Sequence, residues 1–428
     1  MFRVRLSSPE PCGRQGCACG VTEKWGYDGD MKTTVAAIDF GTSKIVTLVA
    51  ENSGTQRCDI IGAGIAAYDG YLEDGWNNPG ALNEAIMASV EDAEKQSRRK
   101  IHDINVGVPG AFTKVYATEA RIALKGTDPR VTAADVRAAF KAAESNLGEH
   151  MGVVVHSSPA WFSLDDGKRT LEPVGQPGRE LSALISFVVA DKFFTDEVLT
   201  RLTGLGYNVT GFYSSAAGEA MLFLPEEERD RTCVLIDMGY LNTDVMIVEG
   251  DALTYLHTID VGGGNIAADL AIGLDIPLKD AEEKIKRQYT YGIDTPGETY
   301  ELLGVDGQKP RTFTREEVSE IITPRVEEIA EDIQKSLDDS GIHLGNWSNI
   351  YLTGGGLSFN RGGRDFLSSK LGRPVRDTPK RTAKLNSHAY SSALGLMDLI
   401  IDTIEQRNRQ SASSGGAVKE FFRSLLGG

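Results

Sequence analysis

Two short segments of the sequence combine a carboxylate with a glycine in a way that suits phosphate binding. Asp39 and Asp237 each follow an apolar run rich in β-branched residues, and each begins an Asp-x-Gly turn that leads into a second apolar run. Glycine lets the backbone approach a phosphate closely, and consecutive N–H groups of such a turn can point at its oxygens. A carboxylate at a strand end can hold a hydrated Mg²⁺, which usually keeps several of its waters. One such turn alone is common, but two in matching contexts predict a pair of phosphate-binding hairpins.

A third glycine-rich segment extends this pattern. Residues 352–356 (LTGGG) follow a strand-like run, and a helix is expected after them. Glycines at this place let an adenosine approach the backbone. The three segments in this order predict a nucleotide held between two hairpins, which clamp its β- and γ-phosphates from both sides.

The hairpins need strands and helices around them, and the sequence predicts an α/β fold. Apolar runs predict strands on both sides of Asp39 and of Asp237, and further strands over 104–108 and 350–353. Residues 111–187 predict a small α/β insertion, with three strand-like stretches, a helix over 133–143 and a hairpin turn at Asp165-Asp166-Gly167. Apolar periodicity predicts further helices over 79–95, 196–204, 215–224, 280–288, 315–339 and 387–404.

The composition restricts the classes of function. The chain has 428 residues, of which 41% are hydrophobic and 25% charged, as in globular proteins of two to four domains. The net charge of -16 leaves no basic excess, so no nucleic-acid partner is expected, and an anionic membrane would repel the body of the protein. No apolar run reaches the roughly 18 to 20 residues that span a bilayer. The odd number of cysteines, five, favours a reducing cytoplasm.

The first thirty residues differ from the rest. Cys12, Cys17 and Cys19 lie close together, but three thiols without a fourth ligand make only a weak metal site. The segment is polar and lacks the apolar centre of a secretory signal. Residues 1–30 are therefore expected to be a disordered extension, or the product of a wrongly chosen upstream start codon. An intact mass that includes Met1 would exclude the second explanation.

The C-terminal residues predict a membrane-binding segment. Residues 406–416 are polar and of low complexity, which is typical of a flexible linker. Residues 417–428 predict an amphipathic helix, and a terminal helix packed on the body is the alternative. Because one short tail of nearly balanced charge binds lipid weakly, attachment is expected to depend on many tails presented together by self-association. The apolar face consists of Val418, Phe421, Phe422, Leu425 and Leu426.

Residues 38–44, the Asp237 hairpin and residues 353–356 resemble the actin and heat-shock-chaperone ATPase superfamily. Within it the sequence is most similar to the FtsA family of bacterial cell-division actin homologues. The resemblance extends from Met31 to the C-terminus and implies an actin-like two-lobed fold of duplicated ribonuclease-H-like domains, with a small α/β subdomain inserted in the first lobe. Motifs of the FtsA family occur at 162–165, 173–175, 178–181, 281–286, 324–328 and 372–375.

The resemblance also implies domain boundaries. After the extension 1–30, the first-lobe core comprises 31–107 and 188–230, on either side of the inserted subdomain 108–187. The second-lobe core comprises 231–275 and 345–384, on either side of a small subdomain at 276–344. A closing helix at 385–405 returns to the first lobe and precedes the linker 406–416 and the membrane helix 417–428.

Site residues can be assigned from the same resemblance, with ATP and Mg as the implied cofactors. Asp39 and Asp237 would hold Mg through water. Glu283 and Lys286 would contact the nucleoside, although the pair also suits an ordinary helix surface. The implied nucleotide-binding residues of the first lobe are Asp39, Gly41, Thr42, Ser43 and Lys44. Those of the second lobe are Asp237, Gly239, Tyr240, Asn242, Thr243, Gly262, Gly263, Gly264, Asn265, Glu283, Lys286, Gly354, Gly355, Gly356 and Ser358.

Two departures from the superfamily pattern bear on catalysis. Tyr240 and Leu241 stand where glycine is usual, and they would crowd the second phosphate loop. The Glu or Gln that positions the attacking water is not evident, since its place falls near Tyr213 and Glu219 is a distant substitute. In-line attack by water needs such a group. Slow or negligible ATP hydrolysis is therefore expected.

The family implies a filament-forming protein at the cytoplasmic face of the cell membrane, at the division site, which tethers the ring of the tubulin-like protein FtsZ. The C-terminal peptide of FtsZ would dock on the small subdomain of the second lobe, where Arg325 is a candidate contact; a helix-start proline followed by a solvated arginine is the alternative. Later division proteins are further candidate partners. The alternative function is an actin-like assembly ATPase of the pilus-assembly or chaperone-reactivase type, which would not need an amphipathic tail. A sugar kinase fits less well, because no catalytic base is evident.

Overall fold

The computed structural model describes residues 33–52, 58–72, 75–148, 152–292, 297–302, 310–379 and 387–413. The predictions for the cysteine cluster in residues 1–30 and for the tail 417–428 lie outside these residues. Within the described ranges, no helix combines the length and apolar character needed to cross a membrane.

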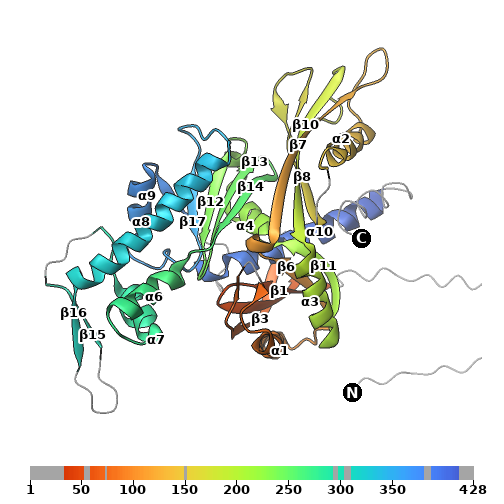
Figure 1. Ribbon diagram of the computed structural model, residues 1–428. Helices are drawn as coiled ribbons and strands as arrows, with labels where there is room; N and C mark the ends of the chain where they lie inside the picture. The colour runs from red at the N-terminus through yellow and green to blue at the C-terminus, as the bar shows by residue number, and fades with distance from the viewer. Residues whose placement is uncertain are drawn as a thin grey trace, which may run out of the picture.

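The first lobe is built on a five-stranded sheet in the order β11-β6-β1-β2-β3. β1 pairs antiparallel with β2 and parallel with β6, so the predicted strand–turn–strand around Asp39 is confirmed. Helices α1 (Pro79–Ser97) and α3 (Lys192–Gly204) pack against this sheet (Figure 1). The strands are β1 (Thr33–Phe40), β2 (Lys44–Asn52), β3 (Cys58–Ala67), β6 (Asp103–Val108) and β11 (Asn208–Ser214), and a short hairpin, β4 (Tyr71–Leu72) with β5 (Gly75–Trp76), lies apart from the sheet.

The second lobe repeats the topology of the first. Its five-stranded sheet has the order β14-β13-β12-β17-β18, in which an antiparallel hairpin is again followed by parallel pairing. The duplication that the two Asp-x-Gly turns predict is therefore present in the strand order. The strands are β12 (Cys233–Met238), β13 (Thr243–Glu249), β14 (Ala252–Ile259), β17 (Ile350–Thr353) and β18 (Val375–Asp377), with helices α6 (Gly263–Gly273), α8 (Arg315–Asp339) and α9 (Gly363–Leu371).

The predicted insertion in the first lobe is a separate four-stranded sheet, in the order β7-β10-β8-β9, with α2 against one face (Figure 1). Asp165 and Asp166 have φ of 49° and 56°, and two consecutive positive values are typical of a type I′ hairpin turn. The predicted turn is thereby confirmed. The elements are β7 (Thr113–Ala123), β8 (Gly152–Leu164), β9 (Arg169–Thr170), β10 (Glu180–Asp191) and α2 (Ala133–Ser145).

The small subdomain of the second lobe corrects one helix prediction. The continuous helix expected over 280–288 is broken into α7 (Leu278–Asp280), a π-helical turn (Ala281–Ile285) and a 3-10 turn (Lys286–Gln288). A π turn holds one more residue than an α turn, so it rotates the side chains that follow. A hairpin of β15 (Thr299–Leu302) and β16 (Arg311–Thr314) precedes α8.

Two crossing helices join the lobes. α4 (Ser215–Phe223) and α10 (Ser391–Ser413) share one apolar core with strands of both sheets. α10 follows a 3-10 turn (His388–Tyr390) and continues past the predicted end at Ile404, so residues 406–413, predicted as linker, are helical. Residues 406–413 include no glycine or proline, the residues that most disfavour a helix. Within the predicted linker, 406–416, the glycines are Gly415 and Gly416.

Candidate functional site

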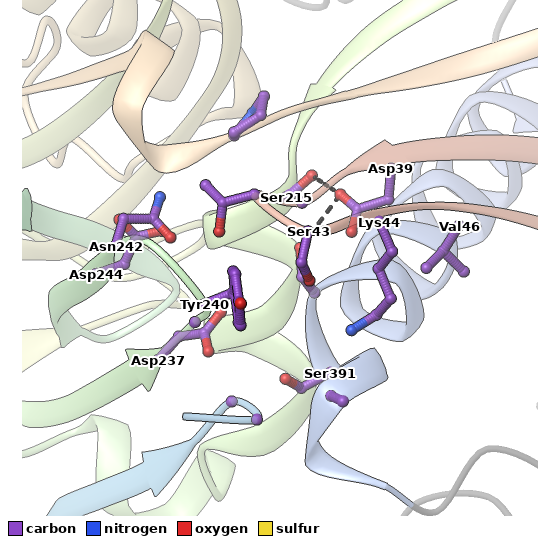
Figure 2. A pocket seen from close by; sticks show the side chains of 18 of the residues that line it. Asp39, Ser43, Lys44, Val46, Ser215, Asp237, Tyr240, Asn242, Asp244 and Ser391 are labelled. Carbon is purple, nitrogen blue, oxygen red and sulfur yellow. Dashed lines mark hydrogen bonds between the residues drawn. The ribbon is translucent and has the colours of Figure 1, made fainter. Parts of the chain in front are cut away.

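A pocket of about 240 Å³ lies between the two Asp-x-Gly hairpins. Figure 2 shows Asp39, Ser43 and Lys44 on one side of it and Asp237, Asn242 and Asp244 on the other. The two hairpins therefore face each other, as the duplicated motif predicts. The predicted residues that line the pocket are Asp39, Gly41, Thr42, Ser43, Lys44, Asp237, Gly239, Tyr240, Asn242, Gly354 and Gly355.

The first hairpin is hydrogen-bonded to the first turns of α4 and α10. Asp39 is 6% exposed, and its Oδ1 accepts hydrogen bonds from Ser215 Oγ of α4 at 2.7 Å and from Ser392 Oγ of α10 at 3.2 Å. Burial raises the pKa of Asp39, and the two hydroxyl groups oppose that rise. In the turn itself, the Gly41 N–H donates to the Lys44 carbonyl at 3.0 Å.

The two hairpins also touch directly. The backbone N–H of Leu241 donates to Thr42 Oγ1 at 3.0 Å, which joins the second hairpin to the first. On the side of the first lobe, the Tyr68 hydroxyl donates to the Gly41 carbonyl at 2.6 Å. The side chain of Thr42 thus bridges the two hairpins.

The second hairpin carries a pair of carboxylates. Asp237 lies opposite Asp244 in the antiparallel register, where the first hairpin has Asp39 opposite Val46. Burial, followed by the charge of Asp244, raises the pKa of Asp237 to about 7, and burial raises that of Asp244 to about 6. Sequence reasoning missed Asp244. The hairpin register was the available signal, because residues directly opposite in a strand pair share a face.

Lys44 interacts electrostatically with Asp237 and Asp39. Burial lowers the pKa of Lys44, and the charges of Asp237 and Asp39 oppose that shift. Its Nζ lies 5.4 Å from the centroid of the Tyr390 ring. The lining holds five carboxyl groups against the two cations Lys44 and Arg287, and this excess of acidic groups fits a hydrated divalent cation. Among the described residues, no three His, Cys, Asp or Glu side chains are grouped so that they could hold a metal ion together.

These raised pKa values predict a pH dependence of the ligand-free protein. A carboxyl whose pKa is higher in the folded state than in the unfolded state stabilises the fold at low pH, and this contribution is lost as pH rises. We expect the free energy of unfolding to fall between pH 4 and about 7, the pKa of Asp237, with Asp244 contributing up to about pH 6. Urea denaturation at a series of pH values would measure it. Asp237→Asn should flatten the profile, whereas the exposed control Asp128→Asn should not; equal slopes in all three proteins would contradict the assignment.

The structure corrects the position expected for Glu219. Glu219 lines the pocket from α4, whereas Tyr213 is 7% exposed within the core shared by the lobes. Glu219 is 1% exposed, and its Oε1 has no hydrogen-bond partner among the described residues. Burial and then the neighbouring charge of Asp237 raise the pKa of Glu219 well above its ordinary range. This shift favours the protonated form of Glu219, which cannot take a proton from water.

The glycines before and within α6 support the second hairpin and lie outside the pocket lining. The Gly263 and Gly264 N–H groups donate to the carbonyls of Gly239 and Tyr240, at 3.0 and 2.6 Å. A methyl group on Gly264 would lie 2.7 Å from the Tyr240 ring, so this glycine makes room for the bulky residue of the second loop. Two further hydrogen bonds fix the chain around this hairpin. The Gly262 N–H donates to Asn265 Oδ1 at 2.9 Å, and Thr243 Oγ1 donates to the Val261 carbonyl at 2.7 Å.

Other predicted residues lie behind the lining. Lys286 is 2% exposed and pairs with Glu282 at 3.0 Å, and Glu282 lines the pocket while Glu283 is exposed. Both glutamates belong to the π turn, and Glu282, not the predicted Glu283, faces the pocket. The Gly356 N–H donates to the Met238 carbonyl at 2.7 Å, and the Ser358 hydroxyl is buried without a partner among the described residues. Lining residues that the sequence did not indicate include Tyr71, Ser215, Arg287, Phe359, His388, Ser391 and Ser392.

The family comparison addresses the second lobe. Residues 234–395, which contain the Asp237 hairpin and the Gly354 loop, match the family model described as "Cell division protein FtsA". The resemblance to FtsA is confirmed. Curated FtsA proteins are similar over most of the chain. The FtsA of Pseudomonas aeruginosa is 25% identical, covering 85% of this chain and 88% of its own, and the FtsA of Neisseria meningitidis is 26% identical, covering 85% and 89%.

Solved structures confirm the actin-like, two-lobed fold expected for a relative of FtsA. The type IV pilus biogenesis complex of PilM and PilN aligns with a TM-score of 0.56 at 18% identity, covering 85% of this chain and 97% of the other. MreB5 of Spiroplasma citri bound to AMPPNP aligns with a TM-score of 0.53 at 11% identity, covering 89% and 99%. At these identities the similarity concerns the fold alone.

Proposed function

We propose that this protein is an ATP-binding, actin-like cell-division protein that assembles into filaments and tethers the FtsZ ring to the membrane. The observation that carries the proposal is the pocket between two facing hairpins, which contribute Lys44 and the three aspartates Asp39, Asp237 and Asp244 to its lining. The chain's curated relatives are FtsA cell-division proteins. The relative MreB5 was solved with AMPPNP, an ATP analogue, which supports a nucleotide in the same fold.

The lining divides into a phosphate side and a nucleoside side. Lys44, the Ser43 hydroxyl and the turn at Gly239 would hold the phosphates. Asp39, Asp237 and Asp244 would hold Mg²⁺ through its waters, and the ion supplies charge neutralisation of the phosphates when bound. The nucleoside side is formed by residues of the second lobe and the α10 entry, namely Gly354, Gly355, Phe359, Glu282, Arg287, His388 and Ala389.

The contact between the hairpins would respond to the nucleotide. Leu241 N–H donates to Thr42 Oγ1 where the two loops meet. A terminal phosphate oxygen is a stronger acceptor than a hydroxyl group, because a charged acceptor strengthens the hydrogen bond. ATP would therefore replace the Thr42 contact and alter the spacing of the lobes, and ADP would leave it in place. Such a difference between lobe arrangements can control assembly.

Hydrolysis is expected to be slow, because the pKa of Glu219, the carboxyl that α4 places in the pocket, is raised and its protonated form is favoured. Glu219→Gln keeps the size and hydrogen-bonding capacity of a protonated glutamic acid. We therefore expect it to leave the rate of phosphate release from ATP within about twofold of the original rate, since no general base is removed. A fall of about 100-fold, the size of a lost general base, would show that Glu219 does accept a proton from water.

Docking of FtsZ would require Arg325 to exchange partners. Arg325 lies inside α8 beyond Pro324, so this proline does not start the helix. Its guanidinium contacts Asp269 at 2.5 Å and Glu328 at 2.5 Å, and its side chain is 26% exposed. An acidic FtsZ C-terminal peptide could replace these carboxylates. Binding of that peptide, measured by fluorescence anisotropy, would then weaken in Arg325→Gln.

The membrane tail is tested best by changes that spare α10. Because α10 reaches Ser413, a truncation after Gly416 removes the tail and keeps the helix, whereas one after Ile404 would cut the helix. With ATP, we expect the full chain to form filaments on lipid monolayers, and the truncated chain to leave the monolayer bare in electron micrographs. Phe421→Ser with Phe422→Ser should reproduce the truncation, and Lys419→Ser, on the opposite face, should not. Decoration by the truncated chain would contradict a tail-dependent tether.

A further inference from the structure

The inserted subdomain carries a second polar pocket, of about 200 Å³, on the face of its sheet opposite α2. Strand register places Arg121 beside Ser182, Ser182 beside Ser163, and Ser163 beside Arg169. One row across four strands thus has two serines at its centre and an arginine at each end. We call it the Arg121–Arg169 pocket, and Glu119, Trp161 and Asp166 also line it.

The floor of this pocket holds donors without acceptors. Ser182 is 5% exposed, and its hydroxyl has no hydrogen-bond partner among the described residues. The indole N–H of Trp161 is likewise buried and unpartnered there. By contrast, the Ser163 hydroxyl donates to the Gly167 carbonyl at 2.9 Å. A buried donor that is left unsatisfied is costly, so a ligand that brings acceptor oxygens would be favoured.

The two arginines retain donor capacity. Arg121 lies 3.7 Å from Asp166 and 3.5 Å from Glu180, longer than the roughly 2.7–2.9 Å of a charge-assisted hydrogen bond. Arg169 pairs with Glu249 of the second lobe and lies over the Trp161 ring, with 4.5 Å from its guanidinium to the ring centroid. Both side chains are more than half exposed, so they can turn toward a ligand.

The charges of the lining define the ligand class. Within the lining, Arg121 and Arg169 are balanced by Glu119 and Asp166, and Glu180 and Glu249 pair with the two arginines from outside it. The pocket therefore has no net positive charge for a phosphate dianion. A metal cation would meet two guanidinium groups and two N–H or O–H donors. A planar carboxylate carries a single negative charge and two acceptor oxygens, and its geometry matches the guanidinium fork.

We propose that the Arg121–Arg169 pocket is a carboxylate-binding site. An acidic side chain or chain end of a polypeptide could supply the group, and so could a free organic acid. Because Arg169 pairs with Glu249 at the turn between β13 and β14, a bound carboxylate competes for a contact between the inserted subdomain and the second lobe. The site is independent of the nucleotide pocket, so its test does not depend on the proposed function.

The test follows the indole N–H signal of Trp161 in the nitrogen–proton NMR spectrum of the full chain, assigned by its loss in Trp161→Phe. The probes are sodium acetate, the capped peptide acetyl-Gly-Glu-Gly-amide, and the same peptide with Gln in place of Glu. We expect a saturable shift with acetate or the Glu peptide and none with the Gln peptide. Arg121→Gln with Arg169→Gln should weaken binding about tenfold or more, because charge-assisted hydrogen bonds are lost.

Two single variants complete the test. Ser182→Ala removes a buried hydroxyl without altering charge and should weaken binding less than the double arginine variant. Arg179→Gln changes an exposed arginine of the same subdomain outside the lining and should leave binding unchanged. Tighter binding of the Glu peptide than of acetate would identify a polypeptide source, and the reverse order a free acid. No saturable shift, an equal shift with the Gln peptide, or full binding by a folded double variant would overturn the proposal.

Discussion

Replacement of Lys44 by methionine is expected to weaken Mg·ATP binding about 100-fold. A hydrogen bond to a charged group contributes roughly 1.5 to 3 kcal/mol, and each 1.4 kcal/mol changes affinity about tenfold. We take the upper value, about 3 kcal/mol, because Lys44 also offsets the charges of Asp39 and Asp237. Both aspartates act to raise the pKa of Lys44, which shows that they stabilise its charged form. Without Lys44, these carboxylates and the phosphates would repel each other. Methionine keeps the apolar stem, so the loss would report the charge.

Isothermal titration of the full chain with ATP in excess Mg²⁺ measures this effect. Lys44→Arg retains the charge with a different shape and should bind with intermediate affinity. Lys100→Met is the matched control, because Lys100 lies on the surface and pairs with Glu94 away from the pocket. If Lys44→Met bound Mg·ATP within about threefold of the original chain, less than 1 kcal/mol, Lys44 would not be a phosphate ligand.

The parts of this site that the sequence predicted are those that local residue order determines. A hairpin keeps its turn residues together, so the family resemblance could assign Gly41 to Lys44 and most of Gly239 to Asn242, and the structure places most of them in the lining. The repeated sheet order of the two lobes follows from the same duplication. Local patterns also predicted the bounds of α8, which has a periodic apolar face, and of β17, which is a short buried run.

The parts that were missed depend on register and on distant contacts. Glu282 takes the place of Glu283 in the lining where a π turn, which no spacing rule reveals, replaces the expected α-helix. Ser392 reaches Asp39 from the far end of the chain, and only the crossing of α4 and α10 brings them together. Asp244 lies opposite Asp237 in the hairpin register, outside the Asp-x-Gly turn to which the sequence motif is confined.

Substitution of Gly395 by alanine is expected to lower the free energy of unfolding by about 3 kcal/mol, the upper end of typical overpacking penalties. Gly395 lies in α10 and packs against the backbone of Gly218 and Glu219 in α4. A methyl group there would overlap the Cα and N of Glu219 and lie 2.6 Å from the Gly218 carbonyl carbon. These are backbone atoms, so no rotamer change relieves the overlap and the helices must separate. The clash outweighs the roughly 1 kcal/mol that alanine gains over glycine inside a helix.

Urea denaturation would measure the loss, with Gly204→Ala as the control, because that glycine also lies in a helix but has no atom within 4 Å of the added methyl group. The control should be neutral or slightly stabilising. The effect of Gly395→Ala should extend to the pocket, since separation of the helices moves Ser215 and Ser392, which both donate to Asp39. Weaker Mg·ATP binding is therefore expected together with lower stability. Unchanged stability would show that α4 and α10 are not in close contact, and lower stability with unchanged nucleotide affinity would show that the crossing does not position Asp39.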